Sequence, residues 1–282
     1  MKLAVVYNVE SGRKLSKASL EPMMNLAGIT VTDWIAVNAE MKARLAPYRK
    51  KNGIIAVIGG DGTQRAVAEL LIGTGATMAP LPGGTLNHFT KDLKIPQDIE
   101  QAILRLPALK ASKIDVATVN DMVFINNSSI GLYPQSLLER EKTEKILGKW
   151  LAAIRSVILS LFRFQKYRVE VNGEIMRVPF IFVGNNLYDF TGSVFAERTS
   201  LTGGILTLFV LRSWSRLRLL RAGLFDRLGS RKRSSDFIIA HSESLHIKAR
   251  QRELAVSLDG EVIKLVTPLV YKIKPKSLKV LV

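Results

Sequence analysis

The sequence predicts two domains: an N-terminal doubly wound α/β domain and a C-terminal antiparallel β-sandwich domain. Three observations carry this prediction. Short apolar runs alternate with helical patterns over residues 1–113, which is typical of a parallel sheet flanked by helices. Two glycine-rich segments follow strands of that first part. From residue 114 onward strand-like runs and turn signals dominate, so we predict a β-rich domain over 114–282, whose last strand can return to the first domain.

The helices and strands of the first domain are predicted from two patterns. Short continuous apolar runs indicate buried strands, and apolar residues at helical spacing indicate helices. The expected strands are residues 3–7, 29–37, 54–58 and 77–81. The expected helices are residues 15–26 and 39–50, with helical stripes at 66–71 and 86–93. Ligands of such sheets bind at the carboxyl ends of strands, and both glycine-rich segments are predicted to lie there.

The elements of the second domain follow from alternating or β-branched runs and from hairpin signals. Asn120-Asp121, Asn172-Gly173 and Asp259-Gly260 each suit a two-residue hairpin turn. The expected strands are residues 114–119, 122–126, 167–171, 174–183, 205–211, 245–249, 254–258, 262–266, 269–273 and 278–282. Two helical insertions are expected near 135–165 and 213–228.

Composition limits the classes of protein. There are 282 residues, 47% apolar content and no cysteine, which favours folded cores and excludes disulfides, thiolate catalysis and Cys-type zinc sites. No run reaches the roughly 18 to 20 apolar residues that span a bilayer, and the N-terminal apolar run is too short for a secretory signal. A net charge of +17 favours anionic partners: nucleic acid, anionic lipid or phosphorylated small molecules.

The first glycine-rich segment, Gly59-Gly60-Asp61-Gly62-Thr63, follows a β-branched strand and opens a helix. Glycines let the backbone approach a bulky anion, and a helix N-terminus offers free N–H groups and a positive dipole end to phosphate. Asp61 would add a carboxylate that binds Mg²⁺ or orients a hydroxyl. The alternative is a glycine-rich turn in which Asp61 or Thr63 is a helix cap.

The second segment, Pro82-Gly83-Gly84-Thr85-Leu86-Asn87-His88-Phe89, also follows a strand and enters a helix. Two such turns at neighbouring strand ends can hold one nucleotide from both sides. No Gly-Lys-Ser/Thr follows, so the pattern is not a Walker A loop. The alternative for Asn87 and His88 is capping and solvent exposure.

These motifs resemble the catalytic domain of diacylglycerol kinases, sphingosine kinases and ceramide kinases over nearly the whole chain. The resemblance rests on residues 58–64 and 81–89, on an opening Asn-x-x-Ser-Gly at 8–12, and on a late Asp-Gly-Glu at 259–261. Segments 126–131 and 183–186 fall where such proteins have characteristic sheet segments. NAD kinases and phosphofructokinases share the Gly-Gly-Asp-Gly element but lack the Pro-Gly-Gly-Thr-Leu-Asn pattern and the late Asp-Gly-Glu.

The resemblance implies roles for particular residues and a fold like that of NAD kinases and diacylglycerol kinases. Glu261 would be the general base that takes the proton from the lipid hydroxyl, and Asp61 would position phosphate or metal or itself act as base. The residues that would hold ATP are Asn8, Gly59, Gly60, Asp61, Gly62, Thr63, Gly84, Thr85 and Asn87. The alternative for Glu261 is a solvated side chain beside an Asp-Gly hairpin.

The sequence departs from the family's pattern in four places. Val9 replaces a Pro, His88 replaces an Asp, and Asp33 stands about where a nucleotide-contacting Thr is expected. Thr202 and Gly203 stand where many bacterial relatives have the Asp-Gly of a structural Mg²⁺ site, so the sequence assigns no ligands to such a site. Mg²⁺ bound with ATP is a separate requirement and is expected.

Residues 212–233 carry eight basic side chains and one acidic side chain, with Trp and Leu interleaved near helical spacing. A basic amphipathic helix of this type can lie on an anionic membrane surface. Residues 146–164 form a second apolar, basic stretch. The alternative is that both helices cover the β-rich domain, with their Lys and Arg side chains solvated.

We therefore expect an ATP-dependent lipid kinase that transfers the γ-phosphate of ATP to a lipid hydroxyl, with diacylglycerol as the first acceptor, ATP and Mg²⁺ as cofactors, and a β-rich domain that binds lipid. A cytoplasmic protein at the inner face of the membrane is expected, and a homodimer is compatible with the sequence. The alternatives are a sphingoid-base or ceramide kinase, an NAD-kinase-like enzyme, and a catalytically degenerate nucleotide- or lipid-binding protein. Nucleic acid is not an expected partner, because only the charge suggests it.

Overall fold

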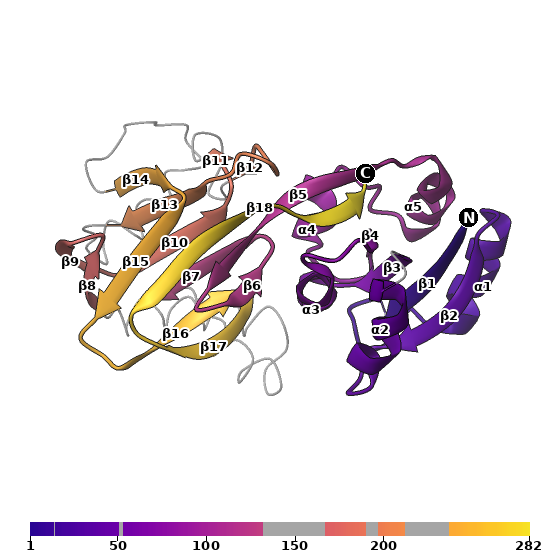
Figure 1. Ribbon diagram of the computed structural model, residues 1–282, viewed down its shortest axis with the longest axis horizontal. Helices are drawn as coiled ribbons and strands as arrows, with labels where there is room; N and C mark the ends of the chain where they lie inside the picture. Colours follow the sequence, from indigo (N-terminus) through magenta and orange to yellow (C-terminus); the bar gives the residue numbers. More distant parts are fainter. Residues whose placement is uncertain (14, 51–52, 132–166, 190–196, 212–236) are drawn as a thin grey trace, which may run out of the picture. The chain divides into compact units, whose positions relative to one another are not determined.

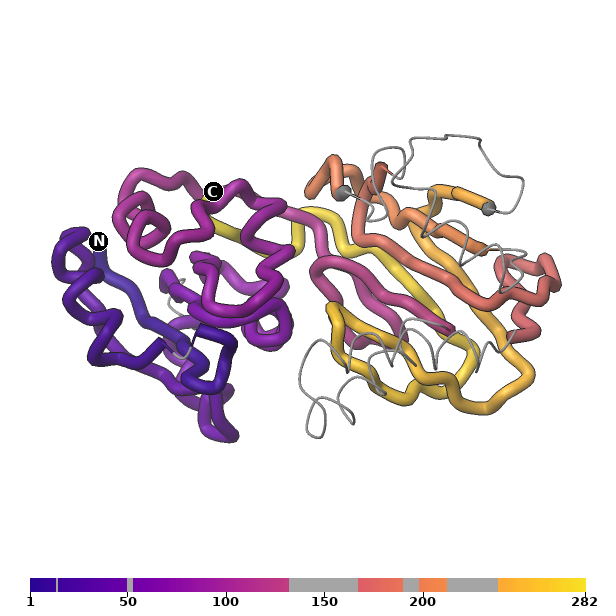
Figure 2. Tube along the Cα trace, turned by 180° about the vertical axis from the view of Figure 1, so that it is seen from behind, coloured from indigo at the N-terminus to yellow at the C-terminus, as the bar shows by residue number. Residues whose placement is uncertain are grey.

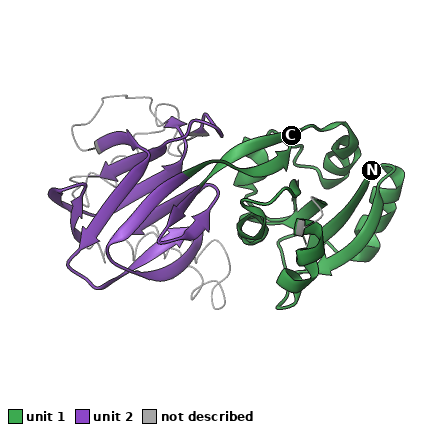
Figure 3. Cartoon of the chain, in the orientation of Figure 1, with its two compact units in different colours: residues 1–116, 274–282 green, residues 117–273 purple. Residues whose placement is uncertain are grey.

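A computed structural model describes residues 1–13, 15–50, 53–131, 167–189, 197–211 and 237–282. The chain divides into two units (Figure 3). Unit 1 comprises Met1–Val116 and Lys274–Val282, and unit 2 comprises Ala117–Ile273. The chain leaves unit 1 through β5 (Ala111–Val119) and returns through β18 (Leu269–Leu281), drawn in yellow in Figure 2.

Unit 1 contains a parallel sheet with strand order β2-β1-β3-β4-β18 (Figure 1). Its remaining strands are β1 (Lys2–Tyr7), β2 (Thr30–Ala36), β3 (Ile54–Gly59) and β4 (Thr77–Pro82). Its helices are α1 (Lys17–Leu26), α2 (Met41–Lys50), α3 (Asp61–Leu71), α4 (His88–Asp92) and α5 (Ile99–Arg105), followed by the 3-10 turn η1 (Leu106–Ala108).

The strand order of unit 1 reverses at β1. The chain runs from β1 to β2 on one side and then crosses to β3 on the other side. Strand β3 is buried from its second residue onward and β4 is buried throughout, as expected for a sheet covered by helices. The reversal places a topological switch point between β1 and β3, where such sheets bind ligands.

Unit 2 contains an antiparallel sheet with strand order β14-β13-β10-β7-β16-β17. Its strands are β7 (Asn127–Gly131), β10 (Phe180–Asn185), β13 (Leu206–Leu211), β14 (Phe237–Ser242), β16 (Glu253–Leu258) and β17 (Glu261–Val266). Within unit 2, β18 also pairs with β15 (Ser244–Ala249), followed by β8 (Tyr167–Val171) and β9 (Glu174–Val178). Strand β6 (Met122–Phe124) pairs with β5, and β11 (Tyr188–Asp189) pairs with β12 (Glu197–Arg198).

The core of unit 2 draws apolar side chains from both sheets. Val183 and Leu208 come from one sheet, and Ile247 and Tyr271 come from the other, and all four belong to one buried cluster. Along β15, exposed and buried residues alternate, so one face of that strand packs inward and the other meets solvent. The predicted fold class, an α/β domain followed by an antiparallel β-sandwich, is therefore confirmed.

The three predicted two-residue turns have the backbone that such turns need. Asn120 and Asp121 have φ values of 46° and 65°, and Asn172 and Gly173 have 48° and 92°. Asp259 and Gly260, with 49° and 92°, join β16 to β17. Positive φ at both central positions is the conformation of a type I′ hairpin turn.

Several predicted elements need correction. The strand expected over 174–183 is divided into β9 and β10 around Pro179, which has no N–H to donate to a ladder. The strands expected at 269–273 and 278–282 form one strand, β18. Helix α5 and strand β14 were not predicted. The helical insertions expected near 135–165 and 213–228 lie outside the described residues. In the part of the chain that the structure describes, no helix is long and apolar enough to cross a membrane.

Candidate active site

The first loop of the candidate site joins β3 to α3. Gly60 is the N-cap of α3, and Asp61 is its first helical residue. The buried Gln64 holds the helix against the sheet, because its Nε2 donates to Val57 O at 2.9 Å and to Leu81 O at 3.0 Å. The N–H groups of the first helical turn have no partner inside the helix, and they lie at its positive dipole end. This end of α3 therefore suits an anion.

The second loop joins β4 to α4 and packs directly on the first loop. Gly83 N–H donates to Gly59 O at 3.1 Å. A Cβ on Gly84 would lie 2.4 Å from Gly60 Cα, so the two backbones can approach this closely only because Gly84 has no side chain there. The two glycine-rich segments thus form one double loop at the ends of neighbouring strands.

Asn87 shapes the second loop from within. It has a φ of 53°, in the left-handed region, and only 4% of its surface is exposed. Its Oδ1 accepts from Gly84 N–H at 2.8 Å, and its Nδ2 donates to Gly84 O at 3.0 Å. Both ends of this side chain are therefore engaged with the loop itself, while the neighbouring Thr85 is exposed.

Asp61 links the two loops. Its Oδ2 accepts from His88 N–H at 3.1 Å, and its Oδ1 accepts from Phe89 N–H at 2.9 Å. The carboxylate of the first loop thus caps the first turn of α4 in the second loop. Carboxylate oxygens are also ligands that Mg²⁺ accepts.

A third loop, residues 8–12 after β1, completes the group. Asn8 Nδ2 donates to Thr63 Oγ1 at 3.2 Å, and Ser11 Oγ donates to Gly83 O at 2.7 Å. A Cβ on Gly12 would lie 2.6 Å from Thr85 Oγ1. The structure therefore brings together, at one edge of the sheet and beside its switch point, every unit 1 residue that was predicted to hold ATP: Asn8, Gly59, Gly60, Asp61, Gly62, Thr63, Gly84, Thr85 and Asn87.

In unit 2 the Asp-Gly-Glu segment has two separate parts. Asp259 lies in the hairpin turn, and its carboxylate accepts from the N–H groups of Ile125 at 2.8 Å, Asn126 at 2.7 Å and Asn127 at 3.1 Å. Glu261 is exposed and begins β17. Asp259 is thus a structural clamp on residues 125–127, and it fixes the turn from which Glu261 projects.

The same segment 125–127 is held from its carbonyl side by residues that sequence reasoning did not select. Arg198 donates to Ile125 O at 2.5 Å and to Asn126 Oδ1 at 3.1 Å. Asn185 Nδ2 also donates to Ile125 O, at 2.9 Å, and the Tyr188 hydroxyl donates to Asn126 O at 2.8 Å. Segments 126–131 and 183–186 resemble sheet segments of the family, but no local pattern indicates Arg198, because its partners lie 72 and 73 residues away in the chain.

No dedicated metal cage is found among the described residues, because no group of three or more His, Asp or Glu side chains lies together there. Thr202 and Gly203 stand where many relatives have an Asp-Gly pair. Nearby, Asn186 Oδ1 is buried without a hydrogen-bond partner and faces Gly203, where a Cβ would lie 3.0 Å away. Thr202 itself makes a local turn, since its N–H donates to Ser200 Oγ at 3.2 Å.

Comparisons with known proteins match both parts of the chain. The family model of the diacylglycerol kinase catalytic domain matches residues 2–119, and that of the YegS C-terminal NAD kinase beta sandwich-like domain matches residues 143–282. A Klebsiella pneumoniae protein named "Probable lipid kinase YegS-like" is 31% identical over 72% of this chain and 69% of its own length.

Two further relatives cover more of the chain. A Synechocystis protein without an assigned activity is 27% identical over 97% of this chain and 66% of its own length. A Staphylococcus aureus protein named diacylglycerol kinase is 24% identical over 91% of this chain and 85% of its own. The crystal structure of a diacylglycerol kinase from Bacillus anthracis superposes with a TM-score of 0.67 at 20% identity, covering 99% of this chain and 96% of that one, which shows a shared fold.

Proposed function

We propose, from the premise that this chain belongs to the family of YegS-like lipid kinases and diacylglycerol kinases, that it transfers the γ-phosphate of ATP to a lipid hydroxyl. Diacylglycerol is the first candidate acceptor. The single observation that carries the proposal is the double glycine loop at the switch point of unit 1. Two backbones in contact, beside a helix N-terminus, suit a polyphosphate better than any uncharged ligand.

ATP would be held mainly by backbone groups. The N–H groups at the start of α3 would bind phosphate oxygens, and the exposed Thr85 would contact the nucleotide from the second loop. Mg²⁺ usually binds nucleotide phosphates together with one or two carboxylates, and Asp61 fits that donor set. When bound, Mg²⁺ supplies charge that offsets the charge of the phosphates. Asp61 would then serve two tasks, since it also fixes the start of α4.

Glu261 is the proposed general base. It is exposed, and its turn is fixed by the Asp259 clamp. In the proposed step the lipid hydroxyl oxygen forms a bond to the γ-phosphorus while the bond to the β–γ bridging oxygen breaks. The hydroxyl proton passes to the Glu261 carboxylate, and ADP leaves. A positioned base of this kind contributes about 10² to 10⁴ in rate.

The test is the Glu261→Gln variant, assayed with labelled ATP, Mg²⁺ and diacylglycerol. We expect kcat to fall about 10²- to 10⁴-fold, while the Kd of ATP stays unchanged because the ATP loops lie in unit 1. Glu253→Gln is the matched control, since Glu253 is another exposed glutamate at the start of a strand of the same hairpin. Equal kcat values for the wild type and Glu261→Gln would show that Glu261 is not the general base.

A substrate screen decides the acceptor. Diacylglycerol, a sphingoid base, ceramide and NAD are each offered with labelled ATP, the lipids in vesicles with and without anionic phospholipid. We expect diacylglycerol to be phosphorylated, and to be phosphorylated faster in anionic vesicles, because the chain carries a net charge of +17. The basic residues 212–233 that we expect at the membrane lie outside the described residues. The proposal would be overturned if none of the three lipids is phosphorylated, whether or not NAD is.

A further inference from the structure

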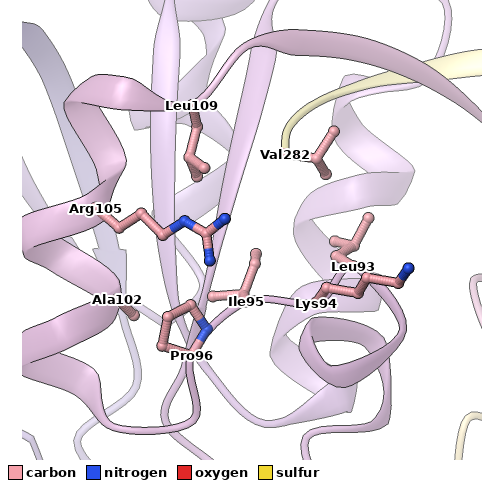
Figure 4. Close-up of a pocket in the computed structure, with 8 residues that line it drawn as sticks. All are labelled: Leu93, Lys94, Ile95, Pro96, Ala102, Arg105, Leu109 and Val282. Carbon is pink, nitrogen blue, oxygen red and sulfur yellow. The ribbon is translucent and has the colours of Figure 1, made fainter.

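A cavity lies in unit 1, at the far end of α4 from the glycine loops. Its volume is about 270 Å³, and it is lined by Leu93, Lys94, Ile95, Pro96, Ala102, Arg105, Leu109 and Val282 (Figure 4). Leu93 and Ile95 are each 6% exposed, and Ala102 is 1% exposed, so the floor of the cavity is apolar and well packed. The cavity is separate from the proposed phosphotransfer site, because none of its lining residues belongs to the three loops.

The polar side chains of the lining are both cations. Lys94 and Arg105 are exposed, and Figure 4 shows the Arg105 guanidinium extending across the cavity. The lining contains no carboxylate side chain, and within the described residues neither cation has an ion pair or a side-chain hydrogen bond. Two unpaired cations above an apolar floor are complementary to a molecule with an anionic head and an apolar tail.

Lys94 occupies a position that favours glycine. It follows Leu93, the C-cap of α4, and has a φ of 57°, while Leu93 N–H donates to Phe89 O at 3.1 Å and Ile95 N–H donates to Thr90 O at 3.0 Å. This is the left-handed position after a helix where glycine is most common, because a Cβ is disfavoured there. A lysine at this position places a positive charge beside the cavity, although its side chain disfavours the left-handed backbone. This combination points to a function for the charge.

We propose that this cavity binds a single-chain anionic amphiphile. The alkyl chain lies on the floor formed by Leu93, Ile95 and Ala102, and the head group lies at Lys94 and Arg105. At roughly 30 Å³ for each water molecule, the volume of about 270 Å³ equals about nine waters. That space accommodates one chain of medium length. The shared chemistry is an anionic head on one alkyl chain, supplied by a fatty carboxylate or by a monoalkyl phosphate.

The experiment is calorimetric titration of the full chain without ATP or lipid substrate, so its outcome is independent of the proposed kinase activity. The probes are decanoate, decyl phosphate, decanol and inorganic phosphate. We expect both anionic amphiphiles to bind below their micellar concentrations. Decanol, which lacks the charge, and inorganic phosphate, which lacks the chain, should each bind at least about tenfold more weakly. The preferred head group then identifies the source of the ligand.

Variants test the two cations. Lys94→Gly removes the charge and suits the left-handed backbone, so it leaves the fold intact, and Arg105→Gln removes the second charge at an exposed position. We expect the double variant to bind decanoate about tenfold more weakly or worse. Lys91→Gln, which removes an exposed charge from α4 outside the cavity, should bind as the wild type does.

Three results would overturn the proposal. Decanol binding as tightly as decanoate would remove the role of the head group. Undiminished binding by the double variant would place the site elsewhere. Absence of binding to the wild type by either anionic probe would remove the site altogether.

Discussion

A single carboxylate can organise several backbone groups at once, and Asp259 is an example. It accepts from three consecutive N–H groups, while Arg198 and Asn185 hold the carbonyl group of the first of those residues, Ile125. Each charge-assisted contact is worth more than a neutral hydrogen bond. The exposed Glu261 can therefore project from a rigid support although its own side chain reaches solvent.

Tyr271 is a buried titratable group whose effect can be measured. It is fully buried, its hydroxyl lies 3.1 Å from Ser128 Oγ, and burial raises its pKa above the ordinary value. The folded state therefore keeps this proton at a pH where the unfolded state loses it. The stability from the protonated tyrosine is fully present below about pH 10, the unfolded pKa, and is lost as pH rises above it.

We expect the free energy of unfolding of the wild type to fall by up to about 1.4 kcal/mol for each pH unit above pH 10 because of Tyr271 alone. Urea denaturation between pH 9.5 and 11.5 measures it. The control is Tyr271→Phe with Ser128→Ala, since the double change leaves no hydroxyl without its partner. If the free energy of unfolding of the wild type and of the double variant fell equally steeply with pH above pH 10, Tyr271 would not be the group responsible.

At the scale of elements, the double glycine loop depends on close contact of two backbones. A Cβ on Gly84 would lie 2.4 Å from Gly60 Cα and 3.0 Å from Asn87 Oδ1. Because the nearest atom is backbone, the loop itself must move to admit Gly84→Ala. We expect this variant to lose about 1 to 3 kcal/mol of stability, as overpacked sites do, measured by urea denaturation.

The partner glycine provides the control for that variant. A Cβ on Gly60 would meet Gly84 Cα at 3.4 Å, an ordinary contact, and Gly60 has a φ of −78° that any residue can adopt. Gly60→Ala should therefore lose less stability than Gly84→Ala, and we expect its loss, the cost of alanine at an N-cap, to stay below about 1 kcal/mol. Equal losses in the two variants would show that the loss comes from removing glycine flexibility and not from the clash.

Most elements could be predicted from sequence because their signals are local. The buried runs of β1, β3 and β4 and the three positive-φ turns are examples. Helix α5 was missed although Asp98 caps it and Ile99, Ala102 and Ile103 are buried at helical spacing, because seven residues give too short a periodic pattern. The sequence could not predict the hydrogen bonds that Asp61, Asn87 and Arg198 make with backbone groups. Each of them depends on backbone groups that only the fold brings near the side chain.

At the scale of the whole molecule, unit 1 is built from two separate stretches of chain. Its last residues, Lys274–Val282, follow all of unit 2 in sequence. Lys279 and Val280 pair with Thr77 and Met78 of β4, and Leu278 and Val280 are fully buried. Val282 and Lys110 exchange two backbone hydrogen bonds, of 3.0 Å and 2.9 Å. The α/β unit therefore completes its sheet only when the end of the chain is present.

We expect a chain that stops at Ile273 to lose the fold of unit 1. It would leave β4 without its outer neighbour and would remove the buried side chains of Leu278, Val280 and Leu281, each worth about 1.5 to 3 kcal/mol. That sum is comparable to the whole stability of a domain. Hydrogen exchange across residues 1–116 measures the effect, and a chain that stops at Leu281 is the control. Unchanged protection of β1, β3 and β4 in the shorter chain would show that residues 1–116 fold without the returning strand.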